Sequence, residues 1–308
     1  MKLTRDTATH TPGTRFIDPQ VLTRLSSLEL IAKTVVSGFI SGLHRAPYLG
    51  LSTDFAEHRA YMPGDDVRRI DWRVYGRTDR LFLREFQAET NANLTIVLDV
   101  SKSMDFHGDG ISKLDYGRYL AASLGYLSLQ QRDRVGLITF DDDLRAMVPP
   151  SIKHFDRVLH ELETATPSRA GGFEKPLAAI ARTLGKRGII AVISDLYVEP
   201  KVLLDALTEL RYRGHDVLVF HILDPREVAL PEADARQFQD MESGVRLPVV
   251  HEQMREAYGN AVHAHMETLH RQLGEHRIDY RFFDTSQPLD HALFEYLTER
   301  QYRMQARR

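Results

Sequence analysis

Near the start of the chain, apolar residues recur at steps of three and four positions, the spacing that places side chains on one face of an α-helix. These residues are Leu22, Leu25, Leu28, Leu30, Ile31, Val35, Val36, Phe39 and Ile40. Asp18 and Pro19 come before them, and this pair is typical of a helix N-cap and first turn. The pattern predicts an amphipathic helix that begins after Asp18 and ends near Gly42.

From Asn93 the pattern changes to short, β-branched apolar runs that are separated by helical segments. The predicted strands cover 94–100, 134–140, 188–195, 216–223 and 278–283, and the predicted helices cover 113–131, 155–162, 176–184, 202–213, 249–273 and 289–302. Strands that alternate with helices of about ten residues predict a mostly parallel sheet with helices on both faces. Ligands of such sheets bind beyond the carboxyl ends of the strands, so functional residues are expected in the loops that follow the strands.

The chain is expected to divide into three parts. Residues 1–15 are polar and lack the apolar core of a secretory signal, so they are predicted to be a disordered tail. Residues 16–91 contain the predicted helix and a short, mixed, charge-rich segment, and we expect them to pack on the main domain. Residues 92–308 form the predicted α/β domain with its C-terminal helices.

Composition narrows the function classes. The 308 residues include 40 Lys and Arg against 43 Asp and Glu, for a net charge of -3, which is not the basic excess of a nucleic-acid binder. The absence of cysteine excludes disulfides, thiolate zinc sites and cysteine nucleophiles. The longest apolar stretch, 28–43, is interrupted by Glu29 and Lys33 and is too short for a membrane span. We therefore expect a cytoplasmic protein without nucleic-acid partners or membrane insertion.

Oxygen-bearing side chains follow two of the predicted strands. Asp99, Ser101 and Ser103 stand at alternate positions after the strand 94–100, and Asp195 ends the strand 188–195. An Asp-x-Ser-x-Ser motif alone is more often a helix cap. Magnesium and similar hard cations, however, take oxygen ligands. The combination of the motif with a strand before it, a helix after it and a second acid favours a metal site formed by these four residues.

These four residues resemble the metal-ion-dependent adhesion site of the von Willebrand factor A fold, whose signature is Asp-x-Ser-x-Ser, then a threonine, then a later aspartate. The run from Tyr61 to Trp72, with Pro-Gly-Asp-Asp-x-Arg-x-Ile-Asp-Trp, is similar to the hallmark of an uncharacterised bacterial family that carries this domain. Leu83-Arg84-Glu85-Phe86 adds to the likeness, which extends from about residue 49 to at least residue 220. Members of that family are commonly encoded beside MoxR-type AAA+ ATPases.

The resemblance implies a Rossmann-like α/β domain of the von Willebrand factor A type that acts as a protein-protein interaction module. It further implies a Mg²⁺ ion, or Mn²⁺ or Ca²⁺, held by Asp99, Ser101, Ser103 and Asp195 and completed by an acidic side chain of a partner. The implied role is that of an adaptor or co-chaperone that works with a MoxR-type AAA+ ATPase on a client protein.

One position departs from the signature and keeps two alternatives open. Phe173 follows Gly171-Gly172, where the family usually has its threonine, and phenylalanine offers no oxygen. The protein could therefore be a metal-free scaffold with a vestigial site, unless Thr164, Thr166 or Ser168 takes the place of the threonine. The second alternative is a metal-dependent phosphohydrolase that uses Asp99 as nucleophile. Ser101 occupies the position where many such enzymes have a second acid, and no other catalytic motif is present, so we expect a binding protein rather than an enzyme.

The charge-rich segment is a second candidate surface. The segment from Asp65 to Glu89 contains six arginines and six acids, so its positive and negative charges cancel. This balance favours structural ion pairs, and partner binding is the second interpretation. The candidate partner-binding residues are Asp65, Asp66, Arg68, Asp71 and Trp72. Trp72 is the only tryptophan, and we favour a packing role over an interface hot spot. Asp141 to Asp143 lack the glycine and distal glutamate of a calcium loop and are predicted to form a solvated turn.

Overall fold

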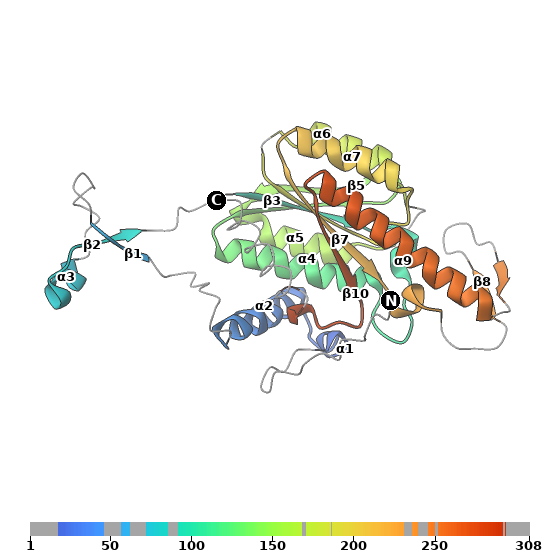
Figure 1. Ribbon diagram of the computed structural model, residues 1–308, viewed down its shortest axis with the longest axis horizontal. Helices are drawn as coiled ribbons and strands as arrows, with labels where there is room; N and C mark the ends of the chain where they lie inside the picture. Colours follow the sequence, from blue (N-terminus) through green and yellow to red (C-terminus); the bar gives the residue numbers. More distant parts are fainter. Residues whose placement is uncertain are drawn as a thin grey trace.

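A six-stranded sheet forms the centre of the protein (Figure 1). Its computed structural model describes residues 18–45, 57–61, 72–85, 92–167, 171–185, 187–230, 236–239, 246–249, 252–291 and 293. The strands, in spatial order, are β10 (Asp279–Asp284), β7 (Asp216–Leu223), β6 (Ile189–Ser194), β3 (Asn93–Asp99), β4 (Arg134–Phe140) and β5 (Leu144–Ser151). All neighbouring strands are parallel except β4 and β5. The predicted α/β class with a mostly parallel sheet is therefore confirmed.

Helices cover both faces of this sheet (Figure 1). On one face lie α2 (Leu28–Arg45), α4 (Lys113–Gln130) and α5 (Phe155–Thr164), and on the other lie α6 (Glu174–Thr183), α7 (Pro200–Tyr212) and α9 (Glu252–Glu275). The central strand β3 contributes to the hydrophobic cores on both faces of the sheet, because Ile96 and Leu98 are buried in one core and Val97 in the other. Burial on both faces explains why the sequence of β3 is a continuous apolar run.

The N-terminal helical region is interrupted where a single helix was predicted. The structure has a short helix α1 (Pro19–Leu22), and α2 begins only at Leu28. Asp18 caps α1 as expected, since its side chain accepts a hydrogen bond from the backbone N–H of Gln20. The hydroxyl of Ser27 accepts a hydrogen bond from the backbone N–H of Leu30 at 3.2 Å. Ser27 therefore provides a second helix start, and the chain turns between the two helices.

Strand β5 is the edge strand that the apolar pattern did not predict. It pairs antiparallel with β4, and its buried and exposed positions alternate irregularly, so it lacks the apolar run of the central strands. Its two prolines are tolerated because an edge strand has one side without a neighbouring strand. Gly136 of β4 allows the close approach, since a Cβ atom there would lie 2.7 Å from the carbonyl oxygen of Val148. A further antiparallel pair, β8 (Arg236–Gln239) and β9 (Arg246–Val249), was also not predicted.

The charge-rich segment contributes a small unit of its own. Strands β1 (Glu57–Ala60) and β2 (Phe82–Glu85) pair antiparallel, and helix α3 (Trp72–Thr78) lies between them in the chain. Residues 46–56 and 86–91 on either side lie outside the described residues, as do residues 1–17 with the predicted disordered tail. Among the helices that the structure describes, none combines the length and the apolar character that crossing a membrane requires.

Candidate functional site

The side chains of Asp99, Ser101 and Ser103, here called the Asp99 cluster, gather at the carboxyl edge of the sheet. Asp99 ends β3, and its side chain is only 1% exposed. One carboxylate oxygen accepts a hydrogen bond from the backbone N–H of Ser101 at 2.8 Å, and the other accepts one from the hydroxyl of Ser194 at 2.6 Å. These bonds fix the carboxylate between the ends of two neighbouring strands, β3 and β6.

The two serine hydroxyls of the Asp99 cluster lie 3.0 Å apart. Ser101 is the N-cap residue of the short 3-10 helix at Lys102–Asp105, but its side chain makes no capping hydrogen bond. Both serines are buried. The helix-cap interpretation of the motif is therefore wrong for Ser101, whose hydroxyl lies beside that of Ser103 instead.

Among the residues that the structure describes, no cationic side chain is bonded to the carboxylate of Asp99. Burial and, after it, the charge of Asp195 raise the pKa of Asp99 to about 7, although hydrogen bonds from Ser194 and Ser101 oppose this shift. A carboxylate whose charge is this unfavourable is a place where a cation would be stabilising. The donors at this point are one carboxylate and two hydroxyls, all of them hard oxygen ligands.

A second group of side chains, here called the Lys113 cluster, lies next to the first and consists of Lys113, Asp195 and Glu227. Lys113 is the first residue of α4, and Glu227 lies in the short helix α8 (Pro225–Val228). The ammonium nitrogen of Lys113 lies 2.7 Å from a carboxylate oxygen of Asp195 and 2.7 Å from one of Glu227. The lysine side chain is 0% exposed. Asp195 thus reaches the predicted edge, but one of its oxygens is bonded to an ammonium group.

The surroundings of Lys113 keep it charged. Burial by itself lowers the pKa of Lys113, but the carboxylates of Asp195 and Glu227 together outweigh burial, so the pKa lies above the usual value for lysine. The ammonium nitrogen also lies 4.9 Å from the centre of the Tyr197 ring, a distance at which a cation is attracted to an aromatic face. Two carboxylates and a ring therefore surround this buried cation.

The loop between β6 and α7 joins the two clusters. Ser194, whose hydroxyl donates to Asp99, accepts a hydrogen bond from the backbone N–H of Leu196 at 3.0 Å. Leu196 has a φ of 52°, a left-handed conformation that a branched residue adopts only when its surroundings enforce it. The strained turn places Asp195 against Lys113 and leaves the side chain of Tyr197 51% exposed. It therefore fixes an aromatic ring at the surface of the site.

Tyr258 connects this arrangement to α9. Its hydroxyl donates to the backbone carbonyl of Glu227 at 2.8 Å, so α9 is bonded to α8 beside the Lys113 cluster.

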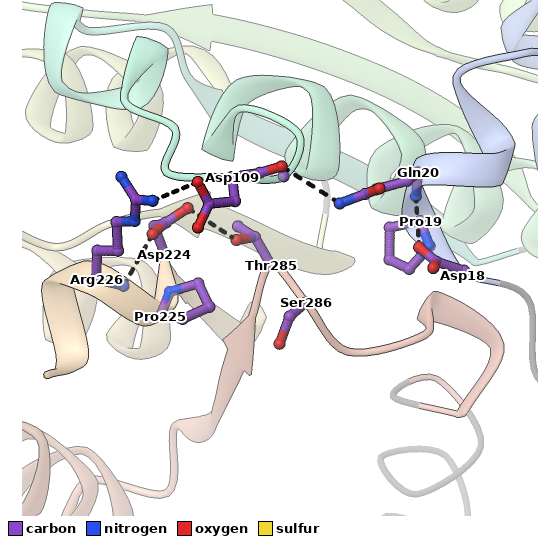
Figure 2. A pocket seen from close by; sticks show the side chains of 10 residues that line it. Asp18, Pro19, Gln20, Asp109, Asp224, Pro225, Arg226, Thr285 and Ser286 are labelled. Atoms are coloured by element: carbon purple, nitrogen blue, oxygen red, sulfur yellow. Dashed lines mark hydrogen bonds and ion pairs between the residues drawn. The ribbon is translucent and has the colours of Figure 1, made fainter. Parts of the chain in front are cut away.

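A pocket of about 210 Å³ opens between α1, the loop before α4 and the start of α8, and its lining includes Gln20, Asp109 and Arg226 (Figure 2). Asp224, which follows β7, accepts hydrogen bonds from the backbone N–H groups of Gly108 at 2.9 Å and Arg226 at 2.8 Å. Arg226 is paired with Asp109, whose backbone carbonyl accepts a hydrogen bond from the side chain of Gln20 (Figure 2). These bonds connect α8 to the loop before α4 and so hold Glu227 in position.

Phe173 serves the core rather than the edge of the sheet. Its side chain is 5% exposed and packs edge-on against Phe140, with ring centres 5.5 Å apart. Thr164, one of the residues considered as a replacement for the missing threonine, donates its hydroxyl to the carbonyl of His160 within its own helix. Among the described residues, no three histidine or acidic side chains converge as a metal site. A cation would therefore depend on the carboxylate and hydroxyls of the Asp99 cluster.

Two predictions about other residues need correction. Asp141 is not part of a solvated turn, because its side chain is fully buried and is paired with Arg145. Trp72 does not have the predicted packing role, since it is 62% exposed and contacts the ring of Tyr75 edge-on. The other candidate partner-binding residues, Asp65, Asp66, Arg68 and Asp71, lie outside the described residues.

The sequence patterns did not reveal Lys113, Glu227 or Tyr197 as members of the site. They come from different segments, and each one alone looks like an ordinary residue of a helix or loop. The only available signal was position, since each lies in or next to a loop that follows a predicted strand.

Comparisons with known proteins place this chain among bacterial relatives. Uncharacterized proteins of Mycobacterium tuberculosis and Mycobacterium bovis are each 32% identical to it over 255 residues, which cover 80% of this chain and 80% of each relative. The solved structures that are similar include the conserved hypothetical protein BatB from Bacteroides thetaiotaomicron, with a TM-score of 0.46, 18% identity, and coverage of 68% of this chain and 98% of BatB. They also include the SpRpn10 VWA domain, with a TM-score of 0.40, 12% identity, and coverage of 66% of this chain and 94% of that domain.

The family model described as "Protein of unknown function DUF58" matches residues 57–268, which is more than half of the chain. The chain therefore belongs to the DUF58 family.

Proposed function

We propose that this protein is an interaction module that binds a divalent cation at the Asp99 cluster and uses it to hold an acidic side chain of a partner protein. The observation that carries the proposal is the geometry of Asp99, Ser101 and Ser103. A buried carboxylate, which has no cationic partner within the described part of the chain, lies beside two hydroxyls that are 3.0 Å apart. Hard oxygen donors of this kind suit Mg²⁺, Mn²⁺ or Ca²⁺.

The charges at the edge of the sheet support the same proposal. Lys113 pairs with Asp195 and Glu227, and the hydrogen bonds to the neighbouring Asp99 carboxylate come from neutral donors. These three carboxylates and one ammonium group leave two negative charges when all four groups are ionised. Burying charges without counter-charges is costly, and a divalent cation would restore neutrality. Bound there, the cation would supply an electrophilic position for a carboxylate from outside. In this proposal Asp195 contributes charge, and Asp99, Ser101 and Ser103 are the ligands.

The proposed biological setting rests on the sequence resemblance of the run from Tyr61 to Trp72. In that setting the protein is cytoplasmic and acts as an adaptor or co-chaperone that links a MoxR-type AAA+ ATPase to a client protein. The exposed ring of Trp72 offers a second contact surface, because tryptophan is enriched at the centres of protein interfaces.

The side chains of the Asp99 cluster favour binding over catalysis. Many phosphohydrolases that use a strand-end aspartate as nucleophile have a second acid two residues on. Ser101 stands at that position, and its hydroxyl lies beside that of Ser103. Turnover of a generic phosphate ester that is lost on Asp99→Ala would overturn the binding proposal.

One observation favours a metal-free scaffold as the second candidate. Phe173 occupies the position of the usual threonine and packs in the core against Phe140, so this position supplies no side-chain oxygen. In this version the same edge binds its partner through Tyr197 and polar side chains, without a cation.

Thermal unfolding separates these candidates. We expect the unfolding temperature to rise when EDTA is replaced by millimolar Mg²⁺ or Mn²⁺, because a free ion at about a hundred times its dissociation constant stabilises by roughly 2.7 kcal/mol. The increase should disappear in Asp99→Ala. Asp109→Ala is the matched control, since Asp109 belongs to the same edge but is 86% exposed. If the wild type shows no increase, or if Asp99→Ala keeps it, the cation proposal is wrong and the metal-free scaffold is the better description.

A further inference from the structure

The Lys113 cluster is arranged like a metal-ion site, but the positive charge at its centre is the ammonium group of Lys113. The ammonium nitrogen has carboxylate oxygens from Asp195 and Glu227 at 2.7 Å each, and the Tyr197 ring on a further side. The side chain of Lys113 is 0% exposed, and those of Asp195 and Glu227 are 2% and 12% exposed. A lysine is almost never buried to this extent unless it is paired.

The ligands of this ammonium group come from separate parts of the chain. Lys113 begins α4, Asp195 follows β6, and Glu227 lies in α8, where its side chain also accepts a hydrogen bond from the backbone N–H of Asp224 at 3.0 Å. The capping box of α8 holds this carboxylate, and the hydroxyl of Tyr258 donates to the backbone carbonyl of the same residue. One carboxylate oxygen of Asp195 accepts a hydrogen bond from the backbone N–H of Tyr197 at 3.5 Å, so each carboxylate has a backbone donor in addition to Lys113.

We infer that Lys113 is the resident cation of this cluster and occupies, through its covalent tether, the place of a second metal ion. Without the ammonium group, two buried carboxylates would lie close together with no counter-charge, which is costly unless a cation lies between them or one of them binds a proton. The carboxyl edge of the sheet would then have two cation positions, one closed by the chain and one open at the Asp99 cluster.

The resident cation also has a consequence for partner binding. The ring of Tyr197 lies 4.9 Å from this ammonium nitrogen, and Tyr197 is 51% exposed. A fixed aromatic ring at a surface binds partners with little loss of side-chain entropy. Loss of the Lys113 charge should therefore disturb the partner-binding surface as well as the fold.

Chemical rescue of Lys113→Ala tests the inference. The variant is refolded in EDTA and its urea unfolding is measured alone, with n-propylammonium, and with n-propanol, which has a similar size and no charge. EDTA keeps divalent ions from the Asp99 cluster, so the outcome does not depend on the proposed function. We expect the variant to lose about a hundredfold or more of its folded-to-unfolded ratio. Propylammonium at about ten times its dissociation constant should restore about tenfold of it.

The comparison between the two additives decides the role of the lysine. Equal recovery with propanol and propylammonium would mean that Lys113 fills space, and no recovery with either would mean that the cluster does not function as a cation site. Either result overturns the inference. Wild type with the same additives is the control for general solvent effects.

A second variant keeps the test decisive when Lys113→Ala does not fold. The double variant Lys113→Ala with Glu227→Gln leaves one carboxylate fewer without a counter-charge, so it should resist more urea than Lys113→Ala alone. A double variant that is no more stable than the single variant would contradict the inference, because charge balance would then not explain the loss.

Discussion

The two clusters at the carboxyl edge of the sheet differ in how their negative charge is balanced. In the Lys113 cluster, Asp195 and Glu227 share an ammonium group that the chain itself supplies. In the Asp99 cluster, the carboxylate accepts hydrogen bonds from neutral donors, and its raised pKa reflects burial and the nearby charge of Asp195. The Lys113 cluster thus obtains its positive charge from the chain, whereas the Asp99 cluster is the place where a cation from solution would be stabilising.

This difference shows that a strand-end acid does not by itself define a ligand. Asp99 and Asp195 both follow buried strands of the same sheet, and both are almost fully buried. Their roles differ because Lys113 begins its helix within reach of Asp195, whereas the carboxylate of Asp99 accepts hydrogen bonds from the backbone of Ser101 and the hydroxyl of Ser194. The partner of each acid, rather than its position in the strand pattern, decides what it can do.

The largest expected effect comes from breaking the complete cluster. Lys113→Met should cost about 3–5 kcal/mol of unfolding free energy, because it leaves buried carboxylates without a counter-charge. Lys175→Met is the matched control, since Lys175 pairs with Asp143 but is 70% exposed, and it should cost less than about 1 kcal/mol. Urea unfolding of both variants in EDTA measures the difference. A similar loss of unfolding free energy in the two variants would show that the buried ion pairs of Lys113 stabilise the fold no more than the exposed pair of Lys175.

A smaller effect is expected where a residue near the open cluster belongs to the core. Phe173→Thr should cost about 3 kcal/mol, because it removes a buried ring from its contact with Phe140. Phe173→Leu, which keeps an apolar side chain, should cost less than about 1.5 kcal/mol. We also expect the stabilisation by Mg²⁺ to be the same in Phe173→Thr as in wild type. A larger Mg²⁺ effect in the threonine variant would mean that this position does face the Asp99 cluster.

The smallest expected effect concerns His221, a neutral base near Asp195. His221 lies on β7, its ring nitrogen Nδ1 is 2.7 Å from the hydroxyl of Tyr280, and its ring faces that of His265. Burial lowers the pKa of His221 from 6.5 to about 3, although the charge of Asp195 opposes this shift. The base that carries positive charge beside Asp195 is therefore Lys113.

A lowered folded-state pKa makes stability depend on pH in a defined direction. The contribution of His221 is present above pH 6.5, where the unfolded side chain is also neutral, and it is lost as the pH falls toward 3. Between about pH 7.5 and about pH 5, wild type should lose about 2 kcal/mol relative to His221→Asn. Urea unfolding across this range measures the difference, and parallel pH profiles for the two proteins would contradict the assignment.

Much of the fold could be predicted because the central strands are buried on both faces. Strands β4 and β7 were predicted with their observed bounds, and strands β3 and β6 to within about one residue at each end. Strands that are buried on both faces need apolar side chains at almost every position, and such runs are easy to recognise in the sequence. Strand β5 was missed because it is an edge strand with alternating burial and two prolines, so its sequence contains no continuous apolar run. The break before α2 was missed because Ser27 caps a helix inside a continuing apolar pattern.

The site could be predicted only in part. Sequence spacing identified Asp99, Ser101, Ser103 and Asp195, because each lies at or directly after a strand end of the same sheet. It gave no indication that Lys113 and Glu227 meet at Asp195, since 114 positions of sequence separate that pair. Contacts of this kind depend on the order of the strands and on the length of the loops, which local patterns do not specify.

Isothermal titration calorimetry with Mg²⁺, on wild type and Asp99→Ala, tests the central difference between the clusters most directly. The Asp99 cluster should bind one ion per chain, because Lys113 already fills the other position, and Asp99→Ala should bind none. Binding of two ions, or binding that Asp99→Ala retains, would contradict this description of the edge. An absence of binding to wild type would show that the Asp99 cluster needs no cation from solution.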